Sequence, residues 1–220
     1  MYIQIFTGTG VHTITGTGGA NTITTGTGND IITPGTGADT ITANAGSNII
    51  NFSAAAQHVA NSVTITDWTA GTYEIDFALA QLNSGAQLID IFDSGDAAAG
   101  DIDVQIITGA TDLGTMATAA GTLMIAVNFT AGIASSDALE TALEYGGDLQ
   151  LTVGGATAVG DRFLVAYDDT VSTYIAMVTN NTAVADDGWF GAGTLTAVNL
   201  VKLTGVADAS AVVANEVDIA

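Results

Sequence analysis

The chain has 220 residues, and 23 acidic side chains against two Lys or Arg give a formal net charge of −21. Such a surface repels nucleic acid and anionic lipid, which proteins bind through Lys and Arg, and it attracts divalent cations. The chain has no Cys, which excludes disulfides and thiolate metal sites. No apolar stretch reaches the roughly 18 residues of a membrane span, so we expect no membrane insertion.

The first segment, Met1–Phe6, alternates like a strand and lacks the basic region and apolar core of a Sec signal peptide. We expect it to be an exposed strand edge that another copy of the chain can extend.

Five blocks of nine residues follow, from Thr7 to Asn51. Glycine is fourth and isoleucine eighth in every block: Gly10 and Ile14, Gly19 and Ile23, Gly28 and Ile32, Gly37 and Ile41, Gly46 and Ile50. Glycine permits the positive φ of a tight turn, and the β-branched residues around each isoleucine favour a short strand. The spacing predicts a parallel β-roll of two sheets with the isoleucines stacked between them, because one block cannot bury its isoleucine alone.

The sixth place of each block holds a polar residue: His12, Asn21, Asp30, Asp39 and Asn48. This pattern resembles the GGxGxDxUx repeat of RTX (haemolysin-type calcium-binding) proteins. The resemblance implies calcium as the cofactor, held between turns on one side of the roll by sixth-place residues and turn carbonyls. Turns on one side are two blocks apart, so we expect Asp30 to face His12 and Asn48, and Asp39 to face Asn21.

Each such site has one carboxylate where the family pattern has two, although Asn offers a carbonyl oxygen. The predicted calcium ligands of the roll are therefore Asn21, Asp30, Asp39 and Asn48, with weakened binding. The alternative is a metal-free roll held by ladders of Asn, Thr and Ile. Because imidazole is a poor calcium ligand, His12 is expected to be a solvated turn residue.

The next segment, Ser62–Ala78, resembles the sequence that commonly follows RTX repeats, through the frames V-x-I-x-D-aromatic and I-D-aromatic. Its alternation predicts strands at Val63–Ile65 and Tyr73–Phe77 around a glycine turn. We expect Trp68 and Phe77 to close the open end of the roll.

An acidic stretch then runs from Leu88 to Val104 without Lys or Arg. Its carboxylates are Asp90, Asp93, Asp96, Asp101 and Asp103. Their spacing does not fit an EF-hand. Either they form a second calcium loop, or alternate Asp side chains face water from strand edges.

The segment Ser135–Tyr145 predicts the one α-helix of the chain. Asp137 and Glu140 have the spacing of a capping box, and Leu139 and Leu143 are expected to face the core.

Strands are predicted at Thr122–Phe129 and in a hairpin of Arg162–Tyr167 with Ser172–Val178. Residues 149–220 resemble the ends of bacterial type I-secreted proteins, which carry an uncleaved C-terminal signal. The predicted fold is all-β, with a short parallel β-roll over residues 1–60. A mainly antiparallel β domain with one short helix is predicted over residues 61–220.

No catalytic constellation stands out, because the chain lacks Cys and has only two His, His12 and His58, neither near a G-x-S-x-G turn. We therefore expect a non-enzymatic, calcium-binding structural protein at the bacterial cell surface or outside the cell. It is expected to self-assemble as a homo-oligomer or polymer into a filament, matrix or surface layer. The alternative is a secreted calcium-dependent adhesion module, with a surface glycan as partner, or a carrier domain of a longer protein.

Overall fold

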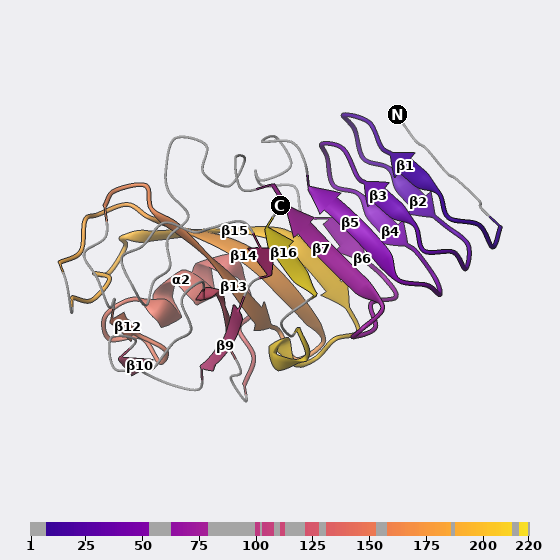
Figure 1. Cartoon of the computed structure of the whole chain (residues 1–220). Coiled ribbons are helices and arrows are strands. Elements are labelled where there is room, and N and C mark those ends of the chain that lie inside the picture. Colours follow the sequence, from indigo (N-terminus) through magenta and orange to yellow (C-terminus); the bar gives the residue numbers. More distant parts are fainter. Residues whose placement is uncertain are drawn as a thin grey trace.

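The computed structural model describes residues 8–52, 63–78, 100–101, 103–107, 111–112, 122–127, 131–152, 158–185, 188–212 and 216–219. Figure 1 shows the repeat segment at one end of the molecule and the helix near the other. The segment Met1–Phe6, His58 and three of the acidic residues (Asp90, Asp93 and Asp96) lie outside the described residues.

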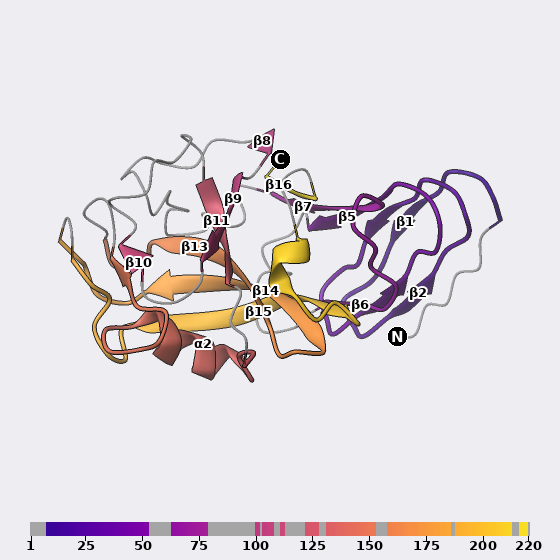
Figure 2. The same ribbon diagram turned by 90° about the horizontal axis from the view of Figure 1, so that it is seen from below.

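The predicted parallel roll is confirmed. On one sheet β1 (Thr13–Thr15), β3 (Ile31–Thr33) and β5 (Asn48–Phe52) pair in parallel, and on the other β2 (Thr22–Thr24) pairs in parallel with β4 (Thr40–Thr42). Figure 2 shows the two sheets facing each other. All five repeat isoleucines are buried between the sheets, and the most exposed of them, Ile14, retains 5% of its surface. This stacked column is the core of the roll.

Both roll sheets continue into the rest of the chain. Strand β6 (Val63–Ile65) pairs with β4, and β7 (Tyr73–Phe77) pairs with β5. Next to them lie β15 (Leu195–Thr204) on β6 and β16 (Val217–Ile219) on β7, both in parallel. Hydrogen bonding therefore runs across the predicted boundary at residue 60. Trp68 and Phe77 are buried in the same core as the repeat isoleucines.

The C-terminal half has mixed pairing, and the expectation of a mainly antiparallel domain is wrong in this respect. The predicted hairpin is present as β13 (Arg162–Asp168) and β14 (Ser172–Asn180), and β14 also pairs antiparallel with β15. By contrast, β9 (Asp103–Ile107) and β13 both lie parallel to β11 (Thr122–Val127). Parallel neighbours need a long crossover, which the chain between β11 and β13 provides with its helix.

Three two-residue strands and a short 3-10 helix complete the described elements. They are β8 (Gly100–Asp101), β10 (Thr111–Asp112), β12 (Leu151–Thr152) and η3 (Ala209–Ala211). Strand β8 pairs with β16 at the edge of the six-stranded sheet, and β10 pairs with β12.

The predicted helix is α2 (Ser136–Leu143), and the prediction that Leu139 and Leu143 face the core is confirmed, because both are fully buried. The prediction of a capping box at Asp137 and Glu140 is wrong. The N-cap is Ser135, whose hydroxyl accepts a hydrogen bond from the Ala138 N–H at 3.2 Å. Glu140 instead accepts a hydrogen bond from the Ala197 N–H on β15.

Two apolar clusters lie on opposite faces of the eight-stranded sheet. One continues the roll core through residues such as Leu164 and Val201, and the other packs under α2 through residues such as Phe163 and Val165. Neighbouring residues of β13 thus face opposite clusters, which explains why this strand is apolar along almost its whole length.

Candidate calcium site

The sixth-place side chains of the last three blocks each accept a hydrogen bond from the turn two blocks earlier. The N–H of His12 donates to Oδ1 of Asp30 at 2.9 Å, and the N–H of Asn21 donates to Oδ1 of Asp39 at 2.7 Å. The N–H of Asp30 donates to Oδ1 of Asn48 at 3.0 Å. All three pairs are 18 residues apart, which confirms the predicted facing of these residues.

Two carboxylates of the roll are buried and only half satisfied. Asp30 is 0% and Asp39 1% exposed to solvent. Oδ2 of each has no hydrogen-bond partner among the described residues. Burial raises the pKa of Asp39 above its usual value, although hydrogen bonds from Asn21 oppose the shift. A buried charge that is left uncompensated lowers the stability of a folded protein by about 3–5 kcal/mol. A cation at these oxygens would remove that cost.

The turns stack so closely that the carbonyl oxygens of one turn lie against the glycine of the next turn on the same side. A Cβ added to Gly28 would lie 2.0 Å from the carbonyl oxygen of Gly10, and one added to Gly46 would lie 2.2 Å from that of Gly28. Calcium binds carboxylate, amide and backbone carbonyl oxygens, and all three kinds of group occur in these turns. The residues therefore fit calcium, and Asp30 and the side-chain oxygen of Asn48 stay its predicted ligands on one side of the roll.

His12 lies in a turn with a partly solvated side chain, as predicted, but its ring also contacts a carboxylate. Its Nδ1 lies 3.1 Å from Oδ1 of Asp30, and its side chain is 36% exposed while that of Asp30 is fully buried. A carboxylate oxygen only accepts hydrogen bonds, so Nδ1 carries the proton in this contact. His12 therefore supports the Asp30 carboxylate from the first turn.

Asp67, in the segment after the repeats, also accepts backbone hydrogen bonds from an earlier turn, and both of its carboxylate oxygens have partners. Its carboxylate accepts hydrogen bonds from the N–H of Ala43 at 3.3 Å and of Asn44 at 2.7 Å, and from the Tyr73 hydroxyl at 2.6 Å. Burial and the nearby Asp67 charge raise the pKa of Tyr73. These contacts satisfy both Asp67 oxygens with protein donors, so this turn closes without a cation.

The acidic stretch does not form one described loop. Asp101 belongs to β8 in the six-stranded sheet, whereas Asp103 belongs to β9 in the eight-stranded sheet. The backbone of Asp101 lies opposite Asp218 of β16. Metal binding by these residues stays a prediction.

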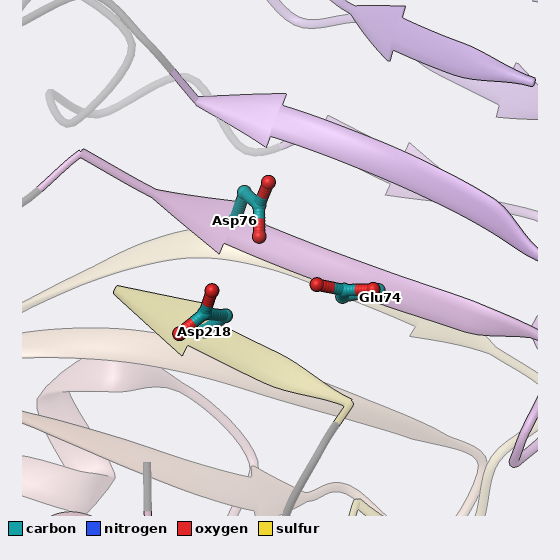
Figure 3. Close-up of side chains that lie close together, drawn as sticks. All are labelled: Glu74, Asp76 and Asp218. Atoms are coloured by element: carbon teal, nitrogen blue, oxygen red, sulfur yellow. The ribbon is translucent and has the colours of Figure 1, made fainter. Parts of the chain in front are cut away.

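A second group of carboxylates lies where β16 meets β7 (Figure 3). Glu74 and Asp76 come from β7 and Asp218 from β16, with one carboxylate oxygen of each within 4.8 Å of the others. Oδ1 of Asp76 is buried and has no hydrogen-bond partner among the described residues. Desolvation, followed by the charges of Glu74 and Asp218, raises the pKa of Asp76 to about 6.

Sequence reasoning missed this group. Alternation in Tyr73–Phe77 places Glu74 and Asp76 on the face away from the core, but nothing in the sequence indicates that β16 pairs with β7. The register that sets Asp218 opposite Asp76 is visible only in the structure.

The Asp76→Asn variant is expected to unfold at a higher temperature than the wild type at pH 8 in calcium-free buffer. Because the folded-state pKa of Asp76 is raised to about 6 from 3.8, its stabilising contribution is complete below pH 4 and is lost as the pH rises through 6. The gain at pH 8 should be about 1–2 kcal/mol after allowance for solvent screening, and it should vanish near pH 4.

Thermal melting at the two pH values measures this difference, with Asp148→Asn as the control. Asp148 is exposed, and its substitution makes the same change in charge. Equal gains at pH 4 and pH 8 would contradict the repulsion between Asp76 and its neighbours.

The stacked turns and their half-satisfied carboxylates define a calcium-binding β-roll. Four copies of the RTX calcium-binding nonapeptide repeat match this region, over residues 6–41 and 35–54. The N-terminal region is therefore an RTX segment; such repeats bind calcium, and the proteins that carry them are typically exported by type I secretion. No curated protein and no solved structure matches the chain. Among the described residues, no helix is long and apolar enough to cross a membrane.

Proposed function

We propose that this chain is a non-enzymatic extracellular structural protein that binds calcium through its roll and assembles with copies of itself. The observation that carries the assembly is the open end of the roll. Strands β1 and β2 stand first in their sheets, and each has a partner on one side only among the described residues. Such an edge offers unpaired N–H and C=O groups to another chain.

The hydrogen bonds of the first coil identify which N–H groups point outward. The N–H of Gly16 donates to the carbonyl oxygen of Thr33, and the N–H of Thr25 donates to that of Thr42. Both N–H groups therefore point toward the next strand of their own sheet, away from the open end. Successive N–H groups of a strand alternate between its two sides. The N–H groups of Thr15 and Thr24 therefore point toward the open end, where an added strand would accept their hydrogen bonds.

Calcium links the two parts of the proposal. At a net charge of −21 per chain, copies repel one another at low ionic strength. Calcium bound at Asp30 and at surface carboxylates lowers this charge and also orders the turns of the roll. Assembly is therefore expected in millimolar calcium outside the cell and not in the calcium-poor cytoplasm. An edge that binds a different surface of the next copy gives open chains.

Light scattering over a calcium titration tests the proposal. Wild-type protein is expected to grow in size with calcium and to return to its starting size when a chelator is added. The double variant Thr15→Pro/Thr24→Pro removes one outward N–H group from each edge strand, and its particles should stay small. Its matched control, Thr15→Ala/Thr24→Ala, keeps both N–H groups and should assemble.

Circular dichroism and thermal melting show whether the proline variant keeps its fold. A wild type that stays monomeric in saturating calcium would overturn the assembly and favour the adhesion or carrier module. Assembly of a folded proline variant at the wild-type rate would overturn the role of the open edge.

A further inference from the structure

The Asn21 side chain lies at a point where oxygen atoms converge. Its Nδ2 is 2.5 Å from the carbonyl oxygen of Gly19, 2.9 Å from Oδ1 of Asp39, 3.2 Å from the carbonyl oxygen of Thr17 and 3.4 Å from that of Pro34. An amide nitrogen has two hydrogens, so it cannot satisfy four acceptors. Three carbonyls and a carboxylate around one centre are the surroundings that a calcium ion takes.

The other side of the roll lacks this arrangement. In the described part of the chain, Oδ1 of Asp30 accepts hydrogen bonds from the backbone N–H and the ring Nδ1 of His12 alone. Asn48 turns its oxygen toward Asp30, and its Nδ2 lies 3.4 Å from the carbonyl oxygen of Asn44 and 3.5 Å from that of Gly46. No side-chain amide nitrogen among the described residues therefore donates to the Asp30 carboxylate.

We propose that the Asn21 carboxamide takes the place of a calcium ion between the turns that end in Asn21 and Asp39. The roll then has one side that its own side chains hold together and one side, at Asp30, that calcium holds together. This inference rests on the proposed calcium binding of the roll. The amide presents its partly positive hydrogens to the same oxygens as a cation would, but it is present at every calcium concentration.

The replacement is incomplete, because Oδ2 of Asp39 has no hydrogen-bond partner in the part of the chain that the structure describes. A carboxylate at position 21 should restore an ion site, since two carboxylates would then face each other across the turns. Asn21→Asp is therefore expected to bind one further calcium ion per chain than the wild type in isothermal titration calorimetry. In chelator, its melting midpoint should fall by more than about 5 °C, and calcium should restore it.

Asn29→Asp is the matched control, because it makes the same chemical change in another turn. Asn29 is exposed, and its Oδ1 accepts the Ser47 N–H at 2.8 Å, a bond that Asp keeps. This variant should show the wild-type calcium stoichiometry and the wild-type midpoint in chelator. An added ion in Asn29→Asp, or none in a folded Asn21→Asp, would overturn the inference.

A second pair of variants decides the question if Asn21→Asp does not fold. Asp39→Asn should leave the calcium stoichiometry of the wild type unchanged, whereas Asp30→Asn should lower it. Equal losses in the two variants would overturn the inference and leave the proposed function standing. A wild type that binds no calcium would instead overturn the proposed calcium binding itself, whatever the Asn21 variant does.

Discussion

Ile32→Ala is expected to cost about 2–5 kcal/mol of unfolding free energy, the range for a large aliphatic side chain removed from a packed core. Ile32 is fully buried and lies in register between Ile14 on β1 and Ile50 on β5. The column cannot close over the lost volume, because backbone hydrogen bonds fix the spacing of the strands. For a chain of this size the midpoint should fall by roughly 5–15 °C in thermal melting.

Ile31→Ala is the matched control, because Ile31 belongs to the same strand and points away from the core with its side chain partly exposed. Its loss should cost less than about 1 kcal/mol, since it leaves no closed cavity. Equal costs at the two positions would contradict the assignment of the inner face.

Asp30→Asn is expected to abolish most of the stabilisation that calcium gives to the roll. A site saturated at 100 times its dissociation constant stabilises the folded state by about 2.7 kcal/mol. For the wild type this corresponds to a rise of roughly 5–10 °C when calcium replaces chelator. The variant should lose that rise because it lacks the charged ligand, while its amide oxygen still accepts the His12 N–H.

Its melting midpoint in chelator should not fall, since the substitution removes a buried charge whose Oδ2 has no hydrogen-bond partner among the residues that the structure describes. Calorimetry with and without chelator measures both effects. Asp148→Asn, at an exposed position, should keep the full calcium response. A calcium response in Asp30→Asn as large as in the wild type would show that this carboxylate is not a ligand.

The roll was predictable from the sequence because its information is local and repeated. A glycine and an isoleucine at fixed places in each block specify a turn and a strand, and five copies specify the stacking. The position of Asp30 opposite His12 follows from the same repeat, because turns on one side of the roll are two blocks apart. The contact between the His12 ring and Asp30 does not, because a repeat pattern says which residues are opposite and not which side-chain conformers they adopt.

The C-terminal half was less predictable because its pairings join distant parts of the chain. The hairpin of β13 and β14 was visible through its short turn, and the helix through its spacing of Leu139 and Leu143. The parallel pairing of β11 with β13 depends on a crossover whose length and course the sequence does not specify. The proximity of Asp76 and Asp218 was unpredictable for the same reason, because their strands, β7 and β16, lie far apart in the chain.

The pairing of β16 with β7 has a consequence for the order of folding. The N–H of Gly71 donates to Oε1 of Glu216 across 145 residues of chain, and the N–H of Ile75 donates to the carbonyl oxygen of Glu216. Strand β15 covers β6 in the same way from far along the chain. Residues 195–219 must therefore be synthesised before β6 and β7 acquire their second neighbours, β15 and β16. Contacts of such long range form slowly, so these two strands remain edge strands until late in folding.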